Sequence, residues 1–75
     1  MIDQTIRLIY PSSMVNVPVI YQLIRSFDVV VNIVSAEITG HQGWIEISIS
    51  AEEGVIREAI NWLKNQGIET LEVND

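Results

Sequence analysis

The chain has no cysteine among its 75 residues and few basic residues. Without cysteine it forms no disulfide and offers no thiolate zinc site, iron–sulfur ligand or thiol nucleophile. Four Lys and Arg residues stand against ten Asp and Glu residues, which gives a net charge of −6. Because phosphate binding depends on clustered Lys and Arg, we expect neither nucleic acid nor an anionic membrane as a partner.

Histidine is equally scarce, and the residues of familiar catalytic sites are missing. His41 is the only histidine and lies in a glycine-bounded turn, so we expect a solvated loop residue rather than a metal ligand. The serines therefore have no histidine to act as general base, and no G-x-x-x-x-G-K phosphate loop occurs. Glu52 and Glu53 are accounted for by the start of a helix. We expect no catalytic residues, no metal and no cofactor.

Long apolar runs are absent as well. No run approaches the ~18 residues of a membrane span, and the N-terminal residues lack the basic and apolar regions of a signal peptide. We expect a cytoplasmic protein without membrane insertion. A hydrophobic fraction of 48% predicts a packed core, in one domain spanning residues 1–75. Because so small a core often stabilises a fold by only ~3–5 kcal/mol, oligomerisation is the expected supplement.

Hydrophobic periodicity predicts four strands and two helices. The strands are expected at residues 2–10, 29–39, 44–50 and 68–73, and the first helix is expected to end near Asp28. Asn16 is its expected N-cap, with Pro18 in the first turn. The second helix is expected to begin with a capping box from Ser50 to Glu53 and to end at a Gly67 C-cap.

The order of these elements, β-α-β-β-α-β, predicts an α+β fold of the ferredoxin-like type. Right-handed crossover connections then give an antiparallel sheet with strand order 4-1-3-2. Both helices lie on one face of such a sheet. The other face is left bare, so we expect a partner there or along the edge formed by the second strand.

A four-residue turn at 40–43 is expected to join the second and third strands and to place Thr39 opposite Trp44. Asn32 then lies opposite Ala51 and faces the helices. An amide left buried and unpaired there costs about 1–3 kcal/mol. The free N–H groups at the start of the second helix, the carbonyls that end the first helix, or a ligand would satisfy it, and the sequence leaves these possibilities open.

The same register places two glutamates, Glu37 and Glu46, directly opposite each other on the bare face of the sheet. Like charges in that arrangement repel each other. Arg7, on the neighbouring strand, is the expected compensating residue. The apolar residues expected beside these charges favour a partner on this face or on the strand edge, most simply a second copy of the chain.

The run Asn32-Ile33-Val34, followed by residues 35–38, resembles the signature of the NIL domain, named for an Asn-Ile-Leu triplet. Valine replaces the leucine here. Residues 16–18, 25–29 and 59–63 extend the resemblance over nearly the whole chain. A related ACT-type regulatory domain would carry a glycine after the first strand, where this chain has Pro11 and two serines.

The resemblance implies a ferredoxin-like regulatory domain of the kind found at the C-terminus of methionine-importing ABC ATPases. In those proteins paired domains bind methionine, and binding inhibits transport. It further implies that Asn32, Ile33 and Val34 contact the ligand. The 75 residues contain no ATPase domain.

Two hypotheses follow. The first is a non-enzymatic, homodimeric effector-binding domain for a small amino acid, with methionine as the candidate ligand. The alternative is a protein–protein interaction module, or a small subunit of a larger assembly, that has kept the fold and lost the ligand.

Overall fold

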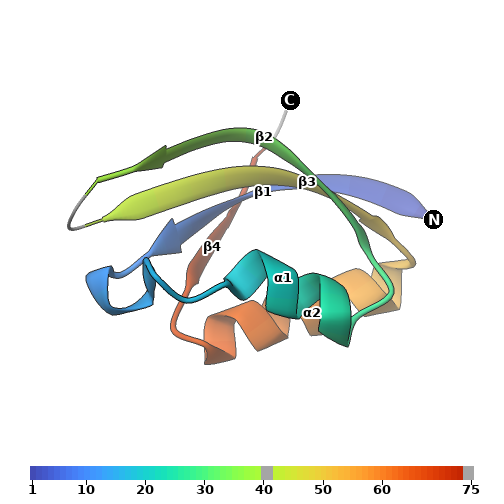
Figure 1. The fold of residues 1–75 in the computed structure, drawn as a ribbon. Helices are drawn as coiled ribbons and strands as arrows, with labels where there is room; N and C mark the ends of the chain where they lie inside the picture. Colours follow the sequence, from blue (N-terminus) through green and yellow to red (C-terminus); the bar gives the residue numbers. More distant parts are fainter. Residues whose placement is uncertain (40–41, 74–75) are drawn as a thin grey trace.

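The computed structural model describes residues 1–39 and 42–73, which form four strands, two α-helices and a short 3-10 helix (Figure 1). The elements are β1 (Ile2–Tyr10), η1 (Ser12–Met14), α1 (Val19–Ser26), β2 (Val30–Ile38), β3 (Gly43–Ala51), α2 (Glu53–Asn65) and β4 (Glu69–Glu72). The sheet is antiparallel in the order β2-β3-β1-β4. This is the predicted order 4-1-3-2 read from the other edge, with both helices on one face (Figure 1). The predicted ferredoxin-like fold is confirmed.

The core lies between the sheet and the two helices. Alternation along β1 turns Ile6, Leu8 and Tyr10 towards the helices, where they are buried. Helical spacing likewise turns one apolar stripe of each helix towards the sheet, where its residues are buried. The other buried residues are Val19, Leu23, Ile47, Ile49, Ala51, Ile56, Ala59, Leu63 and Ile68. No polar or charged side chain of the described residues is buried, and neither helix there is long and apolar enough to cross a membrane.

Helix α1 starts without the predicted side-chain cap. Pro18 occupies the N-cap position, and no side chain bonds the free amides of the first turn. The amide of Val17 donates to the carbonyl of Met14, and that of Val19 to the carbonyl of Val17. These backbone bonds turn the chain before the helix begins, so the prediction that Asn16 is the N-cap is wrong.

The predicted capping box at the start of α2 is also wrong. Ser50 belongs to β3, and its hydroxyl donates a hydrogen bond to the carboxylate of Asp3 on β1. Helix α2 begins at Glu53, with Glu52 in the N-cap position and no side-chain cap bond. Strand β3 runs on to Ala51 because β1 begins at Ile2 and supplies a pairing partner there.

Gly67 ends α2 as predicted. Its φ of +89° lies in the left-handed region, where glycine is favoured because it has no Cβ. The amide of Gly67 donates a hydrogen bond to the carbonyl oxygen of Lys64 at 3.0 Å. The amide of Ile68 donates to the carbonyl oxygen of Leu63 at 3.2 Å. This is the bond pattern of a Schellman motif. Ile68 and Leu63 are both buried, so the turn also starts β4 inside the core.

Alanine at the two glycines Gly67 and Gly54 is expected to change stability in opposite directions. A Cβ at either position meets no atom within 4 Å. Gly67→Ala should lower the free energy of unfolding by about 1–2 kcal/mol, the cost of a left-handed residue with a side chain. Gly54→Ala, within α2, should raise it by about 0.5–1 kcal/mol. Urea titrations of both variants check this. Changes in the free energy of unfolding that have the same sign in both variants contradict it.

The pairing of β2 with β3 differs from the predicted register. Ile38 lies opposite Gly43 and Ala36 opposite Ile45, two residues from the expected partners. A shift by two keeps every side chain on its predicted face. Gly40 and His41, which include the centre of the predicted turn, lie outside the described residues.

A β-bulge at Val34 makes the larger difference. The pairs on either side of it are Ile33 with Ile47 and Ser35 with Glu46, which leaves Val34 without a partner on β3. A slip of one residue turns every preceding side chain to the other face. Asn32 therefore lies opposite Ser48 on the helix-free face, and the prediction that it faces the helices opposite Ala51 is wrong.

Candidate functional site

Strand β2 is an edge of the sheet and is exposed along nearly its whole length (Figure 1). Its residues are rich in β-branched side chains, as a strand requires, yet the helices leave them uncovered. The exposed apolar side chains and their exposed fractions are Val30 60%, Ile33 61%, Val34 58% and Ile38 58%. In native proteins, an edge strand this apolar is usually covered by another element or paired with another strand.

The amide of Asn32 is exposed and free of intramolecular hydrogen bonds to the described residues. Its neighbours across the sheet are Ser48 on β3 and then Thr5 on β1, so three hydrogen-bonding side chains lie in one row. The possibility that the helix start satisfies this amide is excluded, because Asn32 points to the opposite face. Its donor and acceptor groups are available to a ligand.

The three predicted contact residues do not point in one direction. Asn32 lies on the helix-free face, whereas Ile33 pairs with the buried Ile47 and so lies on the helix-facing side. Val34 forms the bulge between them and Ser35. Asn32, Ile33 and Val34 therefore share no face of the sheet, and what they have in common is their place on the open edge strand β2.

The expected contact between Glu37 and Glu46 does not form, because Glu37 lies opposite Trp44 and Glu46 opposite Ser35. Arg7 does compensate Glu46, as predicted. Its Nε and one terminal nitrogen bond Glu46 Oε1 at 3.2 and 3.0 Å. The guanidinium carbon also lies 4.4 Å from the centre of the Trp44 ring. Arg7 is thus held by both an ion pair and a cation–π contact.

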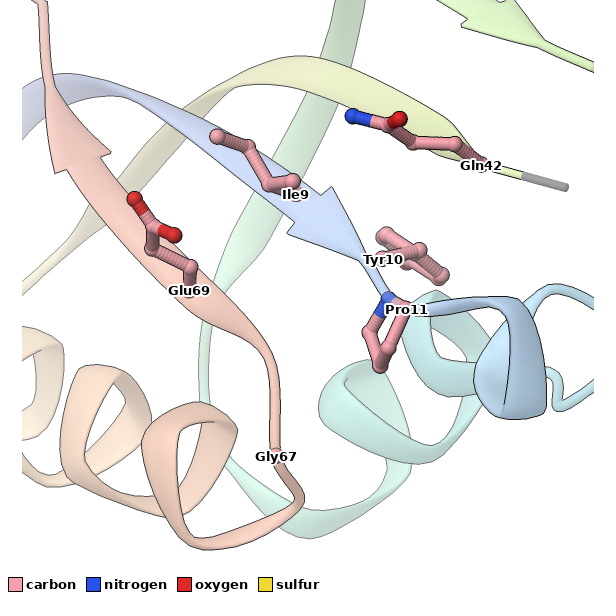
Figure 2. Close-up of a pocket in the computed structure, with 6 residues that line it drawn as sticks. All are labelled: Ile9, Tyr10, Pro11, Gln42, Gly67 and Glu69. Carbon is pink, nitrogen blue, oxygen red and sulfur yellow. The ribbon is translucent and has the colours of Figure 1, made fainter.

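Two hollows lie at the hairpin end of the sheet, where the sequence indicated no site. The larger, of about 280 Å³, is lined by Ile9, Tyr10, Pro11, Gln42, Gly67 and Glu69 (Figure 2). The smaller, of about 190 Å³, is lined by Glu37, Thr39, Gln42, Gly43 and Trp44. They collect residues from separate parts of the chain, and no local motif joins those residues.

Burial raises the pKa of the Tyr10 hydroxyl above its usual value of 10.0. Tyr10 therefore stays neutral at physiological pH and adds no charge to the larger hollow. Figure 2 shows Gln42 and Glu69 on either side of Ile9, with Tyr10 and Pro11 at the end of β1. Among the described residues that line this hollow, Glu69 is then the one that gives it a charge.

The sequence profile of the NIL domain matches residues 4–72. The methionine import ATP-binding protein MetN of Helicobacter hepaticus is 33% identical over 72 residues, covering 91% of this chain and 20% of that protein. The chain thus spans about one fifth of that relative.

A solved structure shares the fold. It is the C-terminal domain of an ABC transporter ATP-binding protein from Enterococcus faecalis, which superposes with a TM-score of 0.83 at 24% identity. The match covers 96% of this chain and 84% of that one.

Proposed function

Because the chain belongs to the NIL domain family, we propose that it is a non-enzymatic regulatory domain that binds a small amino acid as a homodimer. The observation that carries the proposal is the exposed, unbonded amide of Asn32 in an exposed apolar edge strand. A side-chain amide offers both a donor and an acceptor. It therefore suits the carboxylate and ammonium groups of an amino acid, while Ile33 and Val34 offer apolar contacts to its side chain.

The edge of β2 is the surface that favours a second copy. Glu37 is the only charged residue in β2, so two such edges bring together apolar side chains and free backbone groups. The bare face of the sheet is much less suitable. Its charged residues, among those that the structure describes, are Asp3, Glu37, Glu46 and Glu69 against Arg7 alone. Like charges would repel an identical face.

A dimer formed through β2 would also complete the ligand site. In one copy Asn32 and Ile33 lie on opposite sides of the strand, so a ligand at the edge has protein on one side only. A second β2 placed alongside encloses that ligand and excludes water from its polar contacts. Stronger polar contacts follow from the lower local dielectric constant.

Methionine is the first ligand to test, because the relative from Helicobacter hepaticus is a methionine import ATP-binding protein. In the proposed function, the bound amino acid alters how the domain acts on a larger partner in the cytoplasm. The proposal requires no metal, no cofactor and no catalytic residue in this chain.

Free methionine is expected to raise the melting temperature of the purified chain by about 10 °C or more at 100 times its dissociation constant. Mass action then adds ~2.7 kcal/mol of stability, and each kcal/mol shifts the melting temperature of so small a domain by about 4–8 °C. Asn32→Ala should remove most of the rise. Calorimetry with a panel of amino acids measures both.

Asn61→Ala is the matched control, because Asn61 is an exposed amide on α2 and the change removes the same group. It should leave the response to methionine intact. A flat response to every amino acid by the wild-type chain contradicts the proposal and favours an interaction module without a ligand.

A further inference from the structure

The helix-free face carries one row of side chains that crosses all four strands at the hairpin end. Glu37 on β2 pairs with Trp44 on β3, which pairs with Ile9 on β1, which pairs with Glu69 on β4. Residues directly opposite in antiparallel strands share a face. The row therefore has an apolar centre and a carboxylate at each end.

The two carboxylates have no cationic partner among the described residues. Arg7 is already held by Glu46 and Trp44. The other basic residues, Arg25, Arg57 and Lys64, belong to the helices on the other side of the sheet. Within residues 1–39 and 42–73, this face therefore keeps an excess of negative charge that no other side chain neutralises.

The two hollows coincide with the two ends of this row. Glu69 lines the larger hollow beside Ile9 (Figure 2). Glu37 lines the smaller one beside Trp44, and Gln42 borders both. Each joins a carboxylate to an apolar side chain, Ile9 or Trp44, and has no basic side chain among its described lining residues. Both volumes fall below the ~300–1,000 Å³ of a small-molecule pocket. They suit single side chains with an aliphatic stem and a cationic head, which is the form of Lys and Arg.

We propose that this face docks a basic, extended segment of a partner protein, with one Lys or Arg side chain in each hollow. Three strand spacings separate Glu37 from Glu69, which is about 14 Å. An extended chain covers that distance in about four residues and returns its side chains to the same side. The recognised segment thus carries basic residues at positions i and i+4, with an apolar residue at i+2 over Ile9, because the Arg7 guanidinium lies over the Trp44 ring.

This surface differs from the proposed effector site. Glu37 lies five positions after Asn32 on β2, which is about 16 Å along the strand. A dimer formed through the β2 edge leaves the row exposed in both copies. The two proposals can therefore fail independently.

The test uses the ¹⁵N-labelled chain and the capped peptide Lys-Ser-Val-Ser-Lys, followed by NMR at low ionic strength. The expected shifts fall on the amides of Ile9, Gln42 and Trp44, with none at Asn32. Glu37→Gln together with Glu69→Gln should weaken binding by about fivefold or more, because two exposed ion pairs are lost.

The matched control is Glu53→Gln together with Glu58→Gln, which removes the same net charge from α2 on the other side of the sheet. It should change the affinity by less than about twofold. The peptide Lys-Lys-Ser-Val-Ser, of the same composition, should bind several-fold more weakly. Equal weakening by the two double variants, equal affinity for the two peptides, or no shifts with millimolar Lys-Ser-Val-Ser-Lys overturns the proposal.

Discussion

Replacing Leu63 by alanine is expected to leave a large fraction of the molecules unfolded at 25 °C. Leu63 is fully buried. It lies on the apolar stripe of α2, and its carbonyl accepts the Ile68 amide that closes the helix. A buried Leu→Ala change costs about 2–5 kcal/mol. The whole stability of a domain this small is often only ~3–5 kcal/mol, so the single change removes most of it.

Circular dichroism at 25 °C and urea titration measure the effect. Leu71→Ala is the matched control, because it makes the same chemical change on β4 at a side chain that is 44% exposed. It should lower the free energy of unfolding by less than about 1 kcal/mol. A folded, cooperative Leu63→Ala protein with near wild-type stability contradicts the description of the core. The measurement is made at fixed protein concentration, since dimer formation also adds stability.

Placing a lysine at Ile33 is expected to weaken the proposed homodimer by about 10- to 100-fold. Ile33 is 61% exposed in the single chain and would be covered by a second β2. Burying an isoleucine contributes about 1.5–3 kcal/mol, and a lysine on an edge strand opposes pairing with another strand. Sedimentation equilibrium of wild type and Ile33→Lys measures the two dimer dissociation constants.

Leu71→Lys tests whether the effect is specific to the β2 edge, because Leu71 lies on β4, the opposite edge of the sheet. It should leave the dimer unchanged. If Leu71→Lys separates the copies and Ile33→Lys does not, the interface lies on the β4 side and the proposed site at β2 is open to solvent. If the ligand site is shared between copies, Ile33→Lys also loses the response to methionine.

The sequence alone determined the order of elements, the strand order and most of the core. Alternation in β1 and β3 and helical spacing around Leu23 and Leu63 are local patterns, and they survive packing because each buries one apolar face. The Gly67 C-cap was predictable for the same reason, since a positive φ at a helix end is a local requirement. The Asn-Ile-Val triplet and its flanking residues also identified the NIL family, and the match over residues 4–72 confirms it.

Helix starts were less predictable. Ser50 and Asn16 are both residue types favoured at N-cap positions, and each lies close to the start of a helix. Competing backbone pairing decided both cases, through the strand partner of β3 and the turn before α1. A cap residue contributes only about 1 kcal/mol, so an added strand pair or a turn readily outweighs it.

Only the tertiary structure decided the direction of Asn32. Near the hairpin the observed register differs from the predicted one by two residues, so Ala36 and Ser35 lie on their predicted faces. Before the bulge at Val34 the difference is three residues. The hydrophobic periodicity of the sequence does not reveal a bulge of one residue. Because side chains alternate between the two faces of a strand, that bulge moves every preceding side chain to the other face. The sequence determined that an asparagine lies in the second strand, and the fold determined that its amide faces away from the helices, free to bind.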